Sequence, residues 1–138
     1  MLINTARTRL NVVDEGPRDA PVVMFSNSLA SNLDMWAPQA AALRGAYRVI
    51  RYDTRGHGAS DVPPGPYDFA DLCGDVIAVL DALAIPRVHF VGLSLGGMTA
   101  MGLALDHAER VASICAACCT AQARGTAAEP VVPSRHER

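Results

Sequence analysis

The segment Gly92-Leu93-Ser94-Leu95-Gly96 matches the pattern Gly-x-Ser-x-Gly, in which a serine stands on a very tight turn between a strand and a helix. Glycine two residues to either side of the serine removes the Cβ atoms that would otherwise collide in such a turn. The flanks agree, because residues 87–91 have the β-branched and aromatic content of a buried strand and residues 98–105 are mostly helix formers. The pattern therefore predicts a strand, a tight turn and a helix, with Ser94 as candidate nucleophile and Gly92 and Gly96 as the glycines of the turn.

The apolar patterns along the rest of the chain predict alternating strands and helices. The opening residues are followed by a turn-rich stretch, and after that stretch strand patterns and helix patterns alternate regularly. We expect a strand hairpin within residues 2–13, strands over 22–25, 47–52, 87–91 and 111–115, helices over 35–43, 67–83 and 95–107, and a long ordered loop over 53–66. Because strands and helices alternate after the hairpin, the sequence predicts an α/β fold with a mainly parallel sheet and right-handed crossovers.

The length and the net charge of the chain limit the number of domains and the kinds of partner that it can have. A chain of 138 residues, half of them apolar, is long enough for one domain with a sizeable core. The formal net charge of −2 gives no electrostatic reason to expect nucleic acid or an anionic membrane as partner. The opening residues lack the charged and apolar regions of a signal peptide, and no apolar run reaches membrane-spanning length. We expect a cytoplasmic protein.

The character of the sequence changes at about residue 120. Up to residue 119 the apolar period of strands and helices continues, whereas residues 120–138 show no such period and end in a polar stretch. We expect residues 1–119 to form the folded unit and residues 120–138 to be a disordered or out-of-frame tail.

The four cysteines do not predict a metal site. Cys115 and Cys118 have the spacing of half a zinc site or of a redox pair, but no second pair accompanies them. We expect these two, with Cys73 and Cys119, to be small buried hydrophobic residues on a strand end and its following loop.

Three separate motifs, in this order, carry a resemblance to a known family. They are Ser26-Asn-Ser-Leu-Ala30, the loop Arg55-Gly56-His57-Gly58-x-Ser60, and Gly92-Leu-Ser-Leu-Gly-Gly-Met98. Over residues 2–119 the chain resembles the N-terminal part of the α/β-hydrolase fold, and within that family it looks most like the 3-oxoadipate enol-lactonases. The resemblance implies a mostly parallel sheet with an opening antiparallel hairpin, here truncated after the sixth strand.

The resemblance also implies an activity and roles for individual residues. The reaction would be hydrolysis of 3-oxoadipate enol-lactone to 3-oxoadipate, a step of aromatic catabolism in the β-ketoadipate pathway. Ser94 would attack the lactone carbonyl, and the backbone N–H groups of Leu29 and Leu95 would form the oxyanion hole. Trp36 would either line the substrate pocket or pack the helix that it begins. The implied partner is a small lactone or ester, and no metal or organic cofactor is implied.

The same resemblance implies a catalytic acid and a catalytic histidine, and no candidate for either can be recognised after Ser94 in this sequence. In this family an acid and then a histidine follow the serine in chain order, on loops after later strands. His57 belongs to a structural loop in the family, where its ring bonds neighbouring backbone, and we expect the same here. We expect His89 to be a strand residue and His107 a helix-end residue; His136 lies in the expected tail.

The missing acid and histidine leave several interpretations open. The chain would be the front part of a lactonase, inactive as given and cut short by truncation or by a reading-frame shift near residue 120. An esterase or perhydrolase of the same fold is the alternative within enzymes. A catalytically dead interaction module is a rival from another class, and completion by a second polypeptide is a further possibility. The oligomeric state is not predicted.

Overall fold

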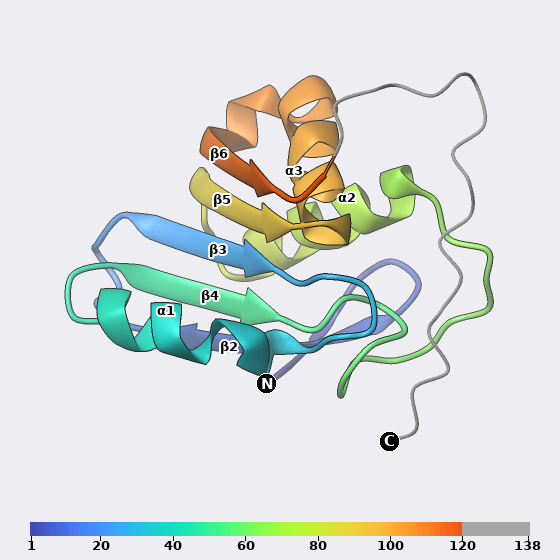
Figure 1. Ribbon diagram of the computed structural model, residues 1–138, viewed down its shortest axis with the longest axis horizontal. Helices are drawn as coiled ribbons and strands as arrows, with labels where there is room; N and C mark the ends of the chain where they lie inside the picture. The colour runs from blue at the N-terminus through green and yellow to red at the C-terminus, as the bar shows by residue number, and fades with distance from the viewer. Residues whose placement is uncertain (120–138) are drawn as a thin grey trace.

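The computed structural model describes residues 1–119 as one six-stranded sheet with helices on both faces (Figure 1). The hairpin, the alternation that follows it and the long loop after residue 52 are confirmed, whereas the two short 3₁₀ helices η1 and η2 were not predicted. In chain order the elements are β1 (Leu2–Asn4), β2 (Arg9–Glu15), β3 (Val22–Ser26), η1 (Leu33–Trp36), α1 (Ala37–Leu43), β4 (Arg48–Tyr52), α2 (Phe69–Ala82), β5 (Val88–Leu93), α3 (Leu95–Asp106), η2 (Ala108–Arg110) and β6 (Val111–Ala117).

The sheet has the strand order β1-β2-β4-β3-β5-β6. The pairs β1/β2 and β2/β4 are antiparallel, whereas β3/β4, β3/β5 and β5/β6 are parallel. The prediction of a mostly parallel sheet with an opening antiparallel hairpin is therefore confirmed. The carboxyl ends of the parallel strands all lie on the same side of the sheet, and Ser94 directly follows the carboxyl end of β5.

The first helix differs in detail from its prediction. It begins two residues earlier than expected, as the 3₁₀ turn η1, and becomes α-helical only at Ala37. The side chain of Asn32 accepts a hydrogen bond from the N–H of Asp34 and so caps η1. Pro38 stands in the first turn of α1, where a missing N–H costs nothing. The polar cap and the proline together set this boundary, which the apolar period alone did not reveal.

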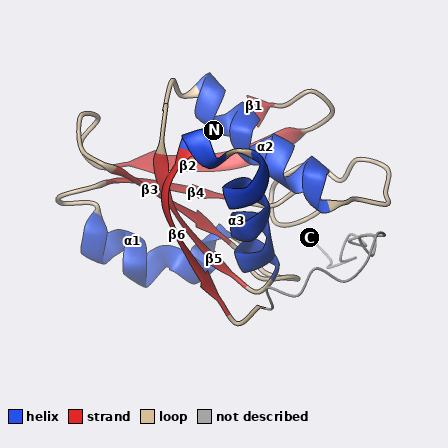
Figure 2. Cartoon of the chain, turned by 90° about the horizontal axis from the view of Figure 1, so that it is seen from above, coloured by secondary structure: helices blue, strands red, loops and turns tan. Residues whose placement is uncertain are grey.

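Two cores lie on opposite faces of the sheet, as Figure 2 shows with α1 on one side and α2 and α3 on the other. The larger core fills the space between the sheet and the pair α2 and α3, with Met24, Phe90, Val76 and Leu103 fully buried. The smaller core lies under η1 and α1 and contains Val23, Phe25, Trp36, Ala40 and Val49. Burial of both faces explains why β3 reads as a continuous apolar run.

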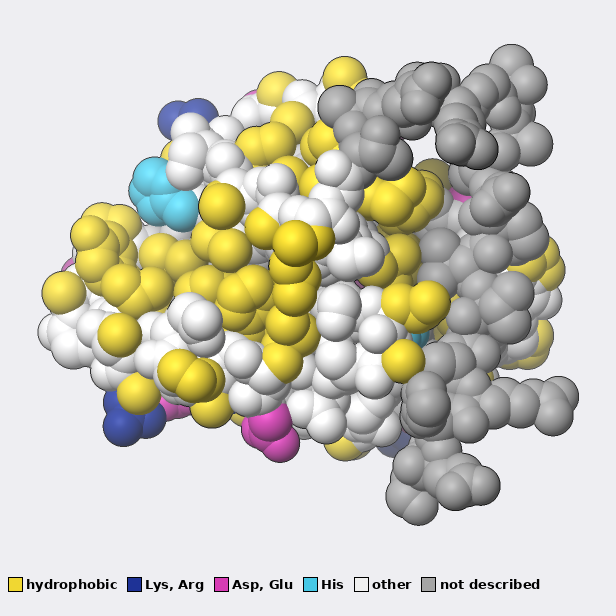
Figure 3. Space-filling view, viewed as in Figure 1, with side chains coloured by type: hydrophobic (Ala, Val, Ile, Leu, Met, Phe, Trp, Pro, Cys, Tyr) yellow, Lys and Arg dark blue, Asp and Glu magenta, His cyan; other side chains and the backbone are white. Residues whose placement is uncertain are grey.

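The strand β6 lies at one edge of the sheet in the described part of the chain, and most of its residues are exposed. On the α1 side of the sheet, Val91 and Leu93 of the neighbouring β5 are only partly buried, and Figure 3 shows hydrophobic side chains exposed on that side. The expectation that the cysteines after residue 110 are buried is wrong for this reason. Cys115 and Cys118 are exposed and Cys119 is half-buried, whereas Cys73 in α2 is buried as expected.

Among residues 1–119, no helix is long and apolar enough to cross a lipid bilayer. The expectation of a disordered or out-of-frame tail concerns residues 120–138 and lies outside the described residues.

Candidate active site

Ser94 occupies a backbone conformation that L-residues rarely adopt, with φ of +53° and ψ of −108°. It links the last residue of β5 to the first residue of α3, and its carbonyl oxygen accepts a hydrogen bond from the N–H of Met98 at 3.0 Å. Its hydroxyl makes no capping hydrogen bond to the helix. A non-glycine residue held in this region is strained, by about 1–3 kcal/mol in general, and persists only where its surroundings fix it. The hydroxyl is thus held out of the helix and left free to react.

The two glycines of the turn are required by close main-chain contacts. A Cβ on Gly92 would stand 2.0 Å from the carbonyl oxygen of Gly96, and a Cβ on Gly96 would stand 2.2 Å from the carbonyl oxygen of Ser26. Neither oxygen belongs to a side chain that could rotate away. The pattern that identified the turn therefore has a steric cause, in which the elbow packs against itself and against the end of β3.

The backbone N–H groups around Ser94 divide into used and unused donors. The N–H of Ser94 donates to the carbonyl oxygen of Ala117 at 2.8 Å, and that of Gly96 donates to the carbonyl oxygen of Asn27 at 3.1 Å. The N–H of Leu95, between them, donates to no group among residues 1–119, and it lies in the first turn of α3, where the helix dipole is positive. It is free to donate a hydrogen bond to an oxygen that becomes negative beside the Ser94 hydroxyl.

Leu29, the other residue expected to supply an oxyanion donor, lies in the loop that packs against the elbow. Its N–H also donates to no group among the described residues, and its side chain is 53% exposed. The start of this loop is fixed at the elbow by the Gly96 to Asn27 hydrogen bond, and the Nδ2 of Asn27 donates to the carbonyl oxygen of Tyr52 at 3.0 Å. The structure thus brings the loop that carries Leu29 to the turn that carries Leu95.

The carboxylate of Asp53, at the end of β4, accepts hydrogen bonds from three segments that are separate in the sequence. It accepts hydrogen bonds from the side-chain amide of Asn11 at 3.1 Å, from the N–H of Leu33 at 2.7 Å and from the N–H of Ala59 at 2.9 Å. Gly58, at φ of +50°, passes so close that a Cβ there would stand 2.3 Å from an Asp53 oxygen. Asp53 therefore ties β2, η1 and the glycine-rich loop to the end of β4.

A buried ion pair fixes the glycine-rich loop, residues 55–60, to α2. The Nε and Nη2 atoms of Arg55 each donate to a different oxygen of Asp75 at 2.6 Å, and the guanidinium lies 5.2 Å from the centre of the Tyr67 ring. Burial raises the pKa of Asp75 although Arg55 opposes that rise. Asp75 was not predicted as a site residue, although it is buried in α2 with Val76 and Val79. An acid inside an apolar stripe, with an arginine in a preceding loop, was the available signal.

None of the described histidines forms a hydrogen bond with the Ser94 hydroxyl. His57 is buried with its Nδ1 3.0 Å from the carbonyl oxygen of Arg55, the contact with neighbouring backbone that was expected. The Nδ1 of His89 lies 2.7 Å from the Ser113 hydroxyl, and His107 ends α3. The hydroxyl of Ser94 has no hydrogen-bond partner among residues 1–119.

Trp36 packs in the smaller core. It is 8% exposed, and its ring centre lies 4.8 Å from that of Phe25 with the planes tilted by 33°. This contact fits the packing role considered for Trp36, and its role in lining a substrate pocket stays a prediction. In the part of the chain that the structure describes, no three histidine, cysteine or acidic residues are grouped to hold a metal ion.

Comparisons with known proteins show which proteins the chain is similar to. The family model described as alpha/beta hydrolase fold matches residues 21–136. The chain is 47% identical over 114 residues to 3-oxoadipate enol-lactonase 1 of Acinetobacter baylyi, which covers 83% of this chain and 42% of that protein. It is 46% identical over 101 residues to a putative carbamate hydrolase RutD of Variovorax paradoxus, covering 72% of this chain and 38% of that protein.

A solved structure shares the arrangement of elements as well. The enol-lactonase from Burkholderia xenovorans superimposes with a TM-score of 0.81 at 46% identity, over 83% of this chain and 45% of that one. The chain thus spans less than half of the length of each of these proteins.

Proposed function

Because this chain belongs to the α/β hydrolase fold family, we propose that it provides the nucleophile and the oxyanion hole of a serine hydrolase acting on 3-oxoadipate enol-lactone. The observation that carries the proposal is the strained conformation of Ser94 on its elbow at the carboxyl edge of the parallel strands. In open α/β sheets, ligands bind at that edge. The substrate follows from the 47% identity to a protein named as an enol-lactonase.

The proposed chemistry is acyl transfer in two steps. The Oγ of Ser94 attacks the lactone carbonyl, and the N–H groups of Leu95 and Leu29 donate to the oxygen that becomes negative. Loss of one such donor typically costs on the order of 10²–10³ in rate. The ring oxygen leaves as an enolate, which takes up a proton on carbon and becomes the ketone of the 3-oxo acid. Water then attacks the acyl group, which leaves as a carboxylic acid and restores the Ser94 hydroxyl.

The serine needs a base, since an unassisted hydroxyl is a weak nucleophile at neutral pH. In the family pattern a histidine later in chain order takes the proton, oriented by an acid. The residues described here place no such group beside Ser94, so the proposal for this chain is the nucleophile side of the site. Whether a second polypeptide brings the base is tested by asking what co-purifies with the chain from its native source.

A carbamate is the second candidate substrate. The 46% identity to a putative carbamate hydrolase favours it, and the same serine and the same backbone donors would serve. A simple ester is a third acyl donor for this machinery.

The test is hydrolysis of 3-oxoadipate enol-lactone by the purified 138-residue chain, followed by loss of its ultraviolet absorbance. Ser94→Ala is the matched control, and acetate esters and a simple carbamate are assayed in parallel. Lactone turnover that disappears in the control supports the proposal. Faster turnover of the carbamate or the ester would replace the substrate. A folded chain that hydrolyses none of the three, either alone or together with the polypeptides that co-purify with it, contradicts an enzymatic role and favours an interaction module.

A further inference from the structure

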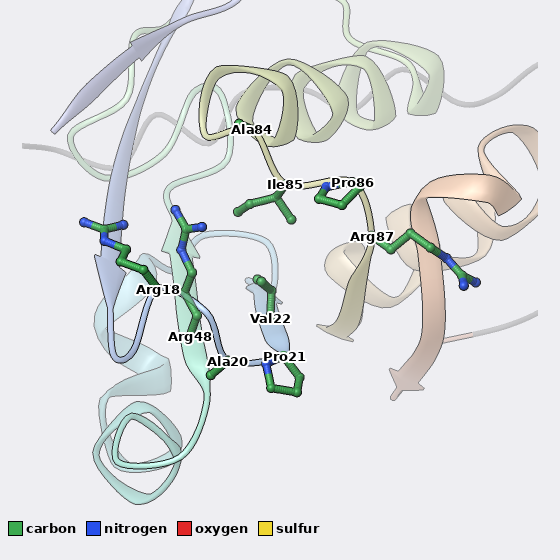
Figure 4. Close-up of a pocket in the computed structure, with 9 residues that line it drawn as sticks. All are labelled: Arg18, Ala20, Pro21, Val22, Arg48, Ala84, Ile85, Pro86 and Arg87. Atoms are coloured by element: carbon green, nitrogen blue, oxygen red, sulfur yellow. The ribbon is translucent and has the colours of Figure 1, made fainter.

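At the amino ends of β3, β4 and β5 the chain forms a cavity of about 250 Å³ that is open to solvent and that the proposed reaction does not use (Figure 4). The turn before β3 lines one side, and the turn between α2 and β5 lines the other. Ser94 follows the opposite end of β5, a six-residue strand that spans roughly 20 Å. A ligand in this cavity cannot reach the Ser94 hydroxyl.

Two arginines at the cavity share a single carboxylate. Arg48 donates from its Nε and Nη2 atoms to the two oxygens of Asp14, at 3.0 and 2.8 Å. The Nη1 of Arg18 pairs with the same carboxylate. The side chain of Asp14 is 1% exposed. Because its one negative charge faces two arginines, the group of three keeps one positive charge. Asp19, the nearby acid of the turn, is exposed and does not line the cavity.

The two guanidinium groups also keep unused donors. Asp14 engages two of the three nitrogens of Arg48 and one of Arg18. The remaining edges match the two oxygens of a carboxylate, which guanidinium groups bind in a fork. The pKa of Asp14 lies below its ordinary value because the pull of Arg48 and Arg18 exceeds the effect of burial. The shared acid therefore stays ionised near neutral pH, and the excess of one positive charge persists.

The rest of the wall is apolar. Val22, Ile85 and Pro86 face the cavity between the two turns, and Ala20 lies at the side of the two arginines (Figure 4). The volume is below the range of about 300–1,000 Å³ usual for drug-sized ligands, so only a small molecule fits. A charged edge beside an apolar wall suits an anion with a short hydrocarbon part.

We propose that this cavity binds a small aliphatic carboxylate, with its carboxyl group on Arg18 and Arg48 and its carbon chain against Val22 and Ile85. This site is separate from Ser94 and is independent of the proposed hydrolysis. Inorganic phosphate shares the charge but has no apolar part, so it should bind more weakly than a short-chain carboxylate.

The test is calorimetric titration of the full chain with butyrate, acetate and inorganic phosphate at constant ionic strength set with chloride. Butyrate should bind most tightly, with a gain of up to about fourfold for each buried methylene relative to acetate. Arg18→Gln should weaken butyrate binding on the order of tenfold, the usual value of a charge-assisted hydrogen bond. Ala20→Phe should weaken it by filling the cavity without changing charge.

Arg87→Gln is the matched control. Arg87 borders the cavity, but Figure 4 shows its side chain directed away from it, and its Nη2 donates to the carbonyl oxygen of Val111 at 3.2 Å. Its loss should leave butyrate binding unchanged. Equal weakening by Arg18→Gln and Arg87→Gln would show a net-charge effect and overturn the site. Phosphate binding more tightly than butyrate would overturn the ligand class, and no binding beyond that of chloride would overturn both.

Discussion

Gly96 lies against the carbonyl oxygen of Ser26 so closely that a Cβ atom on Gly96 would stand 2.2 Å from that oxygen. Both groups are main chain, so Gly96→Ala must push α3 away from the end of β3 and strain the hydrogen bond from Gly96 to Asn27. We expect the free energy of unfolding to fall by about 2–3 kcal/mol, as for overpacked sites. Urea denaturation measures this change.

Gly74 provides the matched control for Gly96. It also lies in a helix, but nothing stands within 4 Å of the position of its Cβ. Gly74→Ala should therefore stabilise the chain by roughly 0.5–1 kcal/mol through the better helix propensity of alanine. Similar effects of the two substitutions would show that the contact at Gly96 is not the cause.

Substitutions at Ser94 test the strain on the elbow. Glycine adopts the observed φ of +53° without the Cβ penalty, whereas alanine keeps it. We expect Ser94→Gly to be more stable than Ser94→Ala by about 1 kcal/mol, the relief of strain being reduced by the greater freedom of glycine in the unfolded chain. Thermal and urea unfolding of the two variants, compared directly, give the difference. A less stable glycine variant would contradict a strained serine.

The ion pair between Arg55 and Asp75 should be costly to break, because both side chains are almost fully buried. Asp75→Asn leaves the Arg55 charge buried without its partner, for which about 3–5 kcal/mol is usual. The variant should unfold at much lower urea concentration. Arg44→Gln, at an exposed pair whose acid Glu15 also pairs with Arg51, should change the midpoint little.

Asp14 should make stability depend on pH in the acid range. Burial raises the pKa of its carboxyl, but Arg48 and Arg18 lower it more, so the folded pKa lies below the ordinary value of 3.8. The unfolded chain then takes up the proton first as pH falls, and the stabilisation present above about pH 4 is lost as pH falls through the folded pKa. Asp14→Asn should flatten this part of the curve. Urea unfolding from pH 5 to pH 2 tests it, and parallel curves for both proteins would refute it.

The thiols should differ sharply in reactivity. Burial, with the nearby Asp106 and Asp68, raises the pKa of Cys73 to about 11, and the residue is only 3% exposed. Cys115 and Cys118 are exposed. With a disulfide reagent at pH 8, Cys118→Ser should remove a fast phase, whereas Cys73→Ser should remove a phase seen only after unfolding. A fast Cys73 would contradict the packing of α2 on α3.

Most of the fold could be predicted because its elements bury apolar residues with a clear period. The stripe of α2 and the continuous run of β3 are examples, and the elbow was visible because steric contact leaves only glycine at positions 92 and 96. The sheet position of each strand is not a local property. The exposure of Cys115 was therefore mispredicted, since it depends on β6 lying at an edge.

The polar contacts of the site were harder to predict for a related reason. Asp53 and Asp75 each act through partners distant in the sequence, such as Asn11 for the first and Arg55 for the second. No periodic pattern marks such partners. The roles of Leu29, Leu95 and Ser94 stay predictions, which the free N–H groups and the strained turn support.

The three hydrogen bonds accepted by Asp53 have a consequence for how the molecule opens. They join Asn11 in β2, Leu33 at the start of η1 and Ala59 in the glycine-rich loop. Such segments would otherwise fray separately, each at its own low cost. Sharing one carboxylate couples these segments into a single cooperative unit. Their backbone amide protons should therefore exchange together and slowly, and the hairpin of β1 and β2 should not unfold before the remaining strands.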